Sequence, residues 1–201
     1  MEDARLRELL RGALEDPDAG VRKAAALALD RFEEERSLDR LLARLVGEDL
    51  RERVQAVYGL GRLRHARARE ALRRALADPI VDVRAAAART LAELPDVRML
   101  EPLIERLEDP EPLVRRTAIV ALGKHGDRRV VPFLETTLDD EDGAVVREAL
   151  RALAEIGGAN ADRVAVFTDH LDPPIRAAAL RALAESCSTD PAPLPSPPPG
   201  A

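Results

Sequence analysis

Residues 109–123 read DPEPLVRRTAIVALG, and this stretch decides the fold. Similar stretches stand at 16–29 (DPDAGVRKAAALAL) and 78–91 (DPIVDVRAAAARTL). In the last of these, Val83, Ala87 and Leu91 recur every four residues, which places them on one face of a helix. The Asp-Pro pair in front stops one helix and lets another begin. Each copy therefore predicts a turn followed by an amphipathic helix.

The same residues recur along almost the whole chain with a step of 31, shortened to 30 at the end. One leucine column runs through Leu29, Leu60, Leu91, Leu122, Leu153 and Leu183, and an alanine column through Ala25, Ala56, Ala87, Ala118, Ala149 and Ala179. Two further columns run through Leu10, Leu41, Leu72, Leu103 and Leu134 and through Leu14, Leu45, Leu76, Leu107 and Leu138, the last followed by Leu171 after 33 residues. Four columns in one register establish a repeat, which has to be recognised before any other feature.

Each repeat is predicted to be a helix A, a short turn and a helix B, so the sequence predicts an all-α solenoid of six two-helix repeats. The units are expected at about 4–33, 37–63, 67–94, 97–124, 128–156 and 160–186, with helix pairs at about 4–15 and 19–33, 37–46 and 50–63, 67–77 and 80–94, 97–108 and 111–124, 128–139 and 142–156, and 160–171 and 173–186. Together they form a repeat domain over 1–186. Residues 187–201 hold six of the fifteen prolines, and we predict a disordered, proline-rich tail there.

Composition narrows the possible functions. The chain is 34% charged and only 2% aromatic, and its net charge is -6, which argues against nucleic acid as a partner. A single cysteine, Cys187, rules out an intramolecular disulfide, and no apolar run is long enough for a membrane span or a signal peptide. These features predict a soluble, cytoplasmic protein.

The motif Asp-Pro-x-x-x-Val-Arg-x-x-Ala-x-x-x-Leu-Gly resembles the HEAT repeat in its short bacterial form, the subtype also found in phycobilisome lyases. The resemblance covers about residues 4–186 and implies a right-handed α-α superhelix. It also implies a ladder in which a turn aspartate and a helix B arginine, six residues apart, tie neighbouring repeats together. The matching residues are Asp16 with Arg22, Asp78 with Arg84, and Asp109 with Arg115. Gly47 and Val146 interrupt the pattern, so a discontinuous ladder is expected.

No catalytic constellation is present in the sequence. His65, His125 and His170 form no HExxH motif, and one cysteine cannot build a zinc cluster. HEAT-fold hydroxylases that bind di-iron use repeated His-Glu pairs, and none of the three histidines is followed by Glu. We therefore expect no catalytic residue, no metal site and no cofactor.

In HEAT solenoids the B helices line the concave surface. Positions one, five and nine after the arginine position of each unit point away from the core. The candidate partner-binding residues there are Lys23, Leu27, Arg31, Val54, Tyr58, Arg62, Arg89, Arg116, Val120, Lys124, Arg147, Arg151 and Arg181. Over all eighteen positions nine side chains are basic and three acidic, so this surface carries +6 in a chain whose net charge is -6.

An exposed aromatic residue among arginines is typical of a protein-binding hot spot, although a solvated helix face with incidental apolar residues is an equal alternative. The leading hypothesis is a non-enzymatic, monomeric scaffold or adaptor that holds an acidic segment of another protein. The alternatives are nucleic-acid binding by the basic face, as in HEAT-like DNA glycosylases, and a non-catalytic subunit or chaperone of a lyase.

Overall fold

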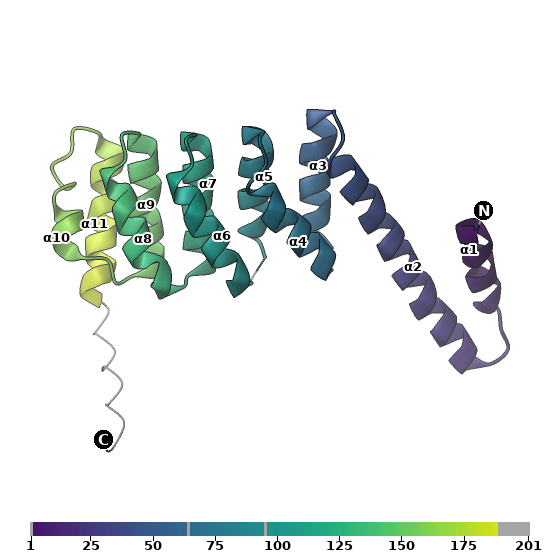
Figure 1. The fold of residues 1–201 in the computed structure, drawn as a ribbon. Coiled ribbons are helices and arrows are strands. Elements are labelled where there is room, and N and C mark those ends of the chain that lie inside the picture. Colours follow the sequence, from purple (N-terminus) through teal and green to yellow (C-terminus); the bar gives the residue numbers. More distant parts are fainter. Residues whose placement is uncertain (1, 64, 95, 189–201) are drawn as a thin grey trace, which may run out of the picture. The chain divides into compact units, whose positions relative to one another are not determined.

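The computed structural model describes residues 2–63, 65–94 and 96–188, and the regular secondary structure in these ranges is entirely helical. The chain divides into two compact units, residues 1–72 and 73–201. The first contains α1 (Glu2–Ala13), α2 (Ala19–Leu45), α3 (Leu50–Gly61) and the start of α4 (Ala66–Ala75). The second contains the end of α4 and then α5 (Val81–Leu91), α6 (Leu100–Ile104), α7 (Pro112–His125), α8 (Val131–Thr136), α9 (Gly143–Ile156), α10 (Ala161–Ala165) and α11 (Pro173–Ser188) (Figure 1). None of the described helices combines the length and the apolar character needed to cross a bilayer.

In the second unit the B helices α5, α7, α9 and α11 pack successively against one another, and α6, α8 and α10 lie beside them (Figure 1). The predicted A helices at 97–108 and 128–139 are present over those residues, but only their middles are α-helical. They are flanked by 3₁₀ turns at Val97–Met99, Glu105–Glu108, Arg128–Val130 and Thr137–Asp139. Pro102 and Pro132 stand in the first turns of α6 and α8, where the missing backbone N–H costs no helical hydrogen bond.

The core of the second unit is built from the columns that repeat in the sequence. Ala87, Ala118, Ala149 and Ala179 are fully buried, as are Leu91, Leu122 and Leu153. The alanine column leaves little side-chain bulk between helices, so that neighbouring B helices can approach closely. The interior therefore consists of thin apolar layers between successive helix pairs, which needs few aromatic side chains.

Gly123 marks a close approach of α7 to α9. A Cβ atom at this position would lie 3.0 Å from the Cβ and 3.3 Å from the Cα of Ala152, with a Glu155 carboxylate oxygen also at 3.3 Å. A larger side chain must push two helices apart, because the first obstacle is a short side chain on a rigid backbone. We expect Gly123→Val to destabilise the protein by about 2 kcal/mol in urea denaturation. Gly12→Val is the matched control for changing a helical glycine and should cost less, because an added Cβ there would meet nothing within 4 Å beyond its chain neighbours and its own helix backbone.

The first unit departs from the predicted helix pairs. Helices were expected at 19–33 and 37–46, but α2 is one continuous helix from Ala19 to Leu45. The residues between the two expected helices, Glu34 to Arg36, are strong helix formers, and neither Gly nor Pro occurs between Gly20 and Gly47. The prediction of two separate helices is therefore wrong, and the count of six helix pairs is not confirmed.

In the first unit, α2 packs against both α1 and α3. Arg7 of α1 contacts Glu33 at 2.7 Å. Further along α2, Leu41 lies so close to Gly59 of α3 that a Cβ on the glycine would meet it at 2.7 Å. One long helix thus supplies both packing surfaces that two helices were expected to provide.

The last repeat is also irregular. Its A helix was predicted at 160–171, but α10 ends at Ala165 and gives way to turns. The hydroxyl of Thr168 donates to the Ala165 carbonyl at 2.8 Å and competes for an acceptor at the point where the helix ends. The last B helix continues through Ser188, two residues into the predicted tail, and residues 189–201 of that tail lie outside the described residues.

Candidate functional site

A groove runs along the outward sides of the B helices in the second unit. It consists of two hollows of about 210 and 410 Å³ that share Val120, Lys124 and Glu148. The smaller is also lined by Arg89, Ala92, Leu113, Arg116 and Thr117, and the larger by Arg151, Ala152, Ala154, Glu155, Ala178 and Arg181. We call this surface the B-helix groove.

Three cations of the groove have no acidic partner within the described part of the chain. Arg89, Arg116 and Arg181 form no ion pair with any described carboxylate, and the Nε atom of Arg116 is buried without a hydrogen-bond acceptor there. A buried donor without an acceptor is unfavourable. The groove therefore offers unused hydrogen-bond donors and positive charge to a ligand.

Two other cations of the groove are already paired. Lys124 forms an ion pair with Glu93, and Arg151 contacts Glu148 at 3.4 Å. Glu148 itself is half-buried between the two hollows, two residues after the arginine position, where sequence reasoning placed no site residue. The sequence could have indicated this pair, because residues three apart in a helix, such as Glu148 and Arg151, lie side by side on its surface. The groove is thus less basic than the predicted surface, since five basic and two acidic side chains line it.

The structure brings together most of the predicted partner-binding residues of the second unit. Arg89, Arg116, Val120, Lys124, Arg151 and Arg181 all line the groove. Arg147 lies outside its lining, half-buried, with Glu148 as a neighbour at 3.7 Å. The remaining predicted residues belong to the first unit, where Lys23, Leu27, Arg31, Tyr58 and Arg62 are exposed and Val54 is half-buried.

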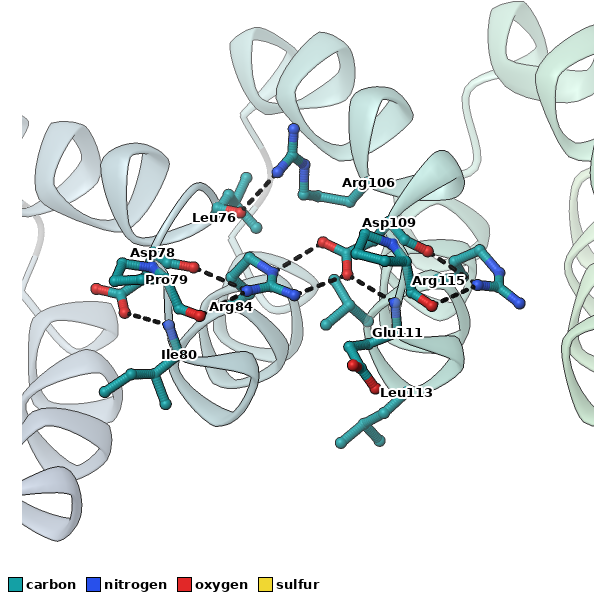
Figure 2. A network of polar contacts seen from close by, with 12 residues as sticks. Leu76, Asp78, Pro79, Ile80, Arg84, Arg106, Asp109, Glu111, Leu113 and Arg115 are labelled. Atoms are coloured by element: carbon teal, nitrogen blue, oxygen red, sulfur yellow. Dashed lines mark hydrogen bonds and ion pairs between the residues drawn. The ribbon is translucent and has the colours of Figure 1, made fainter.

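The predicted ladder is present between repeats of the second unit, but its pairing differs from the expected one. Arg84 donates through Nε and Nη2 to both carboxylate oxygens of Asp109 in the next turn, at 2.8 and 2.9 Å. Its Nη1 donates at 2.9 Å to the backbone carbonyl of Asp78, the residue expected to pair through its side chain (Figure 2). The ion pair thus spans 25 residues, and the six-residue spacing reflects a hydrogen bond to a carbonyl.

Arg115 repeats this geometry one unit later. Its Nε and Nη2 donate to the carboxylate of Asp140 at 2.7 and 2.9 Å, and its Nη1 to the carbonyl of Asp109 at 2.9 Å (Figure 2 shows the latter). A rung consists of such an arginine, the turn that precedes its helix, and the aspartate 25 residues later in the chain. In the first unit, Arg22 likewise donates to the backbone carbonyls of Asp16 and Pro17, whereas a pair with the Asp16 side chain was expected.

Both rungs shift the ionisation of their members. Burial opposes the charged form of Asp109, but hydrogen bonds from Arg84 and the Glu111 backbone N–H outweigh it, so the pKa of Asp109 lies below its ordinary value. For Asp140, burial is likewise overcome by Arg115 and the Asp142 backbone N–H, and its pKa is lowered. The hydrogen bond from Arg84 to Asp109 raises the pKa of this arginine. The rungs are therefore charged and are structural elements between helix pairs.

None of the three histidines is among the residues that line the groove. His65 contacts Glu35 at 3.0 Å, His125 hydrogen-bonds the Leu91 carbonyl at 3.2 Å, and His170 accepts from the Asp172 backbone at 3.0 Å. Across the described ranges, no three His, Cys, Asp or Glu side chains are grouped so that they could hold a metal ion.

Successive helix pairs with a repeated core and repeated rungs define an all-α repeat solenoid. A family model described as HEAT repeats matches residues 1–54, 40–111 and 100–184. The chain therefore belongs to the HEAT-repeat family. Among curated protein sequences, none matches this chain.

Solved structures agree on the fold. An engineered protein is similar with a TM-score of 0.62 and 20% identity, covering 92% of this chain and 97% of the other. A designed armadillo repeat protein in complex with the peptide (KR)4 matches with a TM-score of 0.60 and 18% identity, covering 90% and 99%. The complex of CpcE and CpcF of phycocyanin lyase from Nostoc sp. PCC7120 matches with a TM-score of 0.54 and 25% identity, covering 87% and 74%.

Proposed function

We propose that this chain is a non-catalytic adaptor whose B-helix groove holds an acidic segment of a partner protein. The observation that carries the proposal is the set of three arginines, Arg89, Arg116 and Arg181, that line the groove without a carboxylate partner in the described structure. A carboxylate can accept two parallel hydrogen bonds from a guanidinium, which makes it the complementary ligand.

The groove also has an apolar contact surface. Val120 is exposed and shared by both hollows, and Leu113 and several alanines lie around it. A segment with carboxylates on either side of an apolar residue would match this pattern, because the apolar contact supplies affinity and the charges fix the register. Glu148 lies between the hollows and would reject a carboxylate at that point of the segment.

The designed armadillo repeat protein that shares the fold was solved with a basic peptide, (KR)4. Binding a peptide is thus compatible with a repeat solenoid of this kind. The excess of arginine in the present groove argues for a ligand of the opposite charge.

A labelled (Asp-Glu)4 peptide tests the proposal directly, with (KR)4 as the charge-inverted comparison. Fluorescence anisotropy should show binding of the acidic peptide alone. The double variant Arg89→Glu/Arg181→Glu should bind it about 100-fold more weakly, equivalent to about 2.7 kcal/mol. The same variant should lose a native partner in affinity purification followed by mass spectrometry.

Arg98→Glu/Arg129→Glu is the matched control, because it reverses two exposed arginines outside the groove lining. This control should retain binding. Equal binding by both double variants, or preference for (KR)4, would reject the proposal. Strong binding to DNA that falls steeply with salt would instead favour nucleic acid as the ligand.

A second candidate function is a non-catalytic subunit of a lyase. It is favoured by the similarity to the phycocyanin lyase complex of CpcE and CpcF. The match covers most of the present chain and most of the matched chain of that complex. In this case the segment held by the groove belongs to a lyase partner. Affinity purification distinguishes the two candidates, because the second requires a chromophore-handling protein among the captured partners.

A further inference from the structure

Internal B helices of the second unit have two distinct packing sides. Gly123 of α7 lies against Ala152 of α9, so Gly123 marks the side of a B helix that faces the next repeat, and Ala152 marks the side that faces the previous one. Ile119 stands one turn before Gly123 on the same side, and Leu150 occupies the corresponding place in α9. Both are fully buried. A large apolar residue at this position is therefore normally covered by the following repeat.

The corresponding residue of α11 is uncovered. Leu180 follows Leu150 by 30 residues, the step of the last repeat, and 57% of its surface is exposed. The rung position of the same helix, Arg176, is also incomplete in the described structure. Its Nη1 donates backward to the carbonyls of His170 and Leu171 at 2.7 and 3.0 Å, as in other rungs, but no described carboxylate accepts from its remaining nitrogens.

The first repeat carries the complementary features. Val114 and Val145 lie on the side of α7 and α9 that faces the previous repeat, two turns from Ala121 and Ala152, and both are fully buried. Their counterpart in α2, Val21, is 41% exposed. Val21 is accompanied by a turn aspartate, Asp16, at the position that Asp109 occupies in its own repeat.

The carboxylate of Asp16 is available for an arginine. It accepts from the Asp18 backbone N–H at 2.8 Å, just as Asp109 accepts from Glu111, but within the described ranges no guanidinium reaches it. In the complete rung, Asp109 accepts from the Glu111 N–H and from Arg84 together. The Asp16 turn is thus half of a rung, and Arg176 is the other half.

We propose that two copies of this chain associate head to tail, with α11 of one copy packing on α2 of the next. Leu180 covers Val21 of the second copy, and Arg176 donates to the carboxylate of its Asp16. The contact reproduces between chains the junction that joins neighbouring repeats within the second unit. It departs from the monomer expected from the sequence, and it is separate from the B-helix groove. Because the two surfaces differ, the second copy keeps a free end and further copies can add.

Sedimentation velocity on the full chain, from about 1 µM to about 1 mM, tests the association. We expect the mass average to rise with concentration. Leu180→Glu and Val21→Glu should each abolish the rise, because each removes one of the two surfaces. A mixture of these two variants should form dimers and nothing larger, since only one intact pair of surfaces remains. Circular dichroism verifies that both variants fold.

A charge exchange tests the rung itself. Arg176→Asp and Asp16→Arg should each weaken association about tenfold, and the double variant should recover it, because every junction then pairs an aspartate with an arginine again. Arg181→Glu, beside Leu180 but in the groove, should leave association unchanged while weakening the (Asp-Glu)4 peptide. A wild type that stays monomeric throughout, a mixture that forms no dimer, or a double variant that is not rescued would overturn the proposal.

Discussion

Asp109→Ala is expected to lower the free energy of unfolding by about 3 kcal/mol or more. The Asp109 side chain is only 2% exposed and supplies both acceptors for Arg84, whose side chain is 10% exposed. Removing the carboxylate leaves a nearly buried guanidinium with only its carbonyl partners, which is far more costly than losing a surface ion pair. Urea denaturation followed by far-UV circular dichroism measures the change.

The charge can be separated from the hydrogen bonds. Asp109→Asn keeps an acceptor for the Glu111 N–H and should fall between the wild type and the alanine variant. Arg84→Met/Asp109→Leu should cost less than Asp109→Ala alone, because no unpaired charge is left behind. Asp139→Ala is the surface control, since Asp139 is 76% exposed while paired with Arg163, and it should change stability by about 0.5 kcal/mol or less. An Asp109→Ala loss as small as that of this control would mean that the rung contributes nothing.

Acid should destabilise the second unit through the same carboxylates. Folding lowers the pKa of Asp109 and Asp140, so the native state binds fewer protons than the unfolded chain. The stabilisation is therefore fully present above the ordinary aspartate pKa of about 3.9 and is lost as pH falls through the lowered values. Two protons taken up on unfolding would give a slope of up to about 2.7 kcal/mol per pH unit in that range.

The pH dependence is checked by repeating the urea titration between about pH 5 and pH 2. Asp109→Asn/Asp140→Asn should show a shallower fall, because neither residue can then take up a proton. Asp139→Asn should fall as steeply as the wild type, since no comparable burial surrounds it. If the free energy of unfolding fell equally steeply with pH in the wild type and in Asp109→Asn/Asp140→Asn, acid would destabilise the protein through groups other than these two carboxylates.

The sequence predicted the core of the second unit because its signal is simple. Columns such as Ala87, Ala118 and Ala149 repeat at 31 residues and are all fully buried. The B helices of the second unit were predicted to within a few residues, since Asp-Pro or an equivalent turn precedes each of them. Arg84, Asp109 and Arg115 were predicted as ladder residues, but Asp140 and the 25-residue pairing were missed, because the motif displays only the six-residue spacing.

The departures follow from local chemistry that a repeat register does not contain. The register predicts a break near residue 35. Glu34, Glu35 and Arg36 are strong helix formers, however, and α2 continues through them. Glu148 was missed because a helix-wheel count assigns exposure by angle alone, whereas its carboxylate is held over the groove by Arg151. For the first unit, the sequence supplied the exposed residues of the predicted surface, Tyr58 among them.

The offset of the rungs has an evolutionary consequence. Arg84 and Asp109, like Arg115 and Asp140, are 25 residues apart, while the repeat itself is 31. A tandem copy of residues 85–115 inserted after Arg115 would place an aspartate 25 residues beyond each arginine, so both old junctions and the new one would be satisfied. In-frame duplication or deletion of such a 31-residue segment therefore changes the number of repeats and leaves every arginine of a rung with an aspartate partner. Selection could in this way adjust how many helix pairs a ligand meets in a single genetic event.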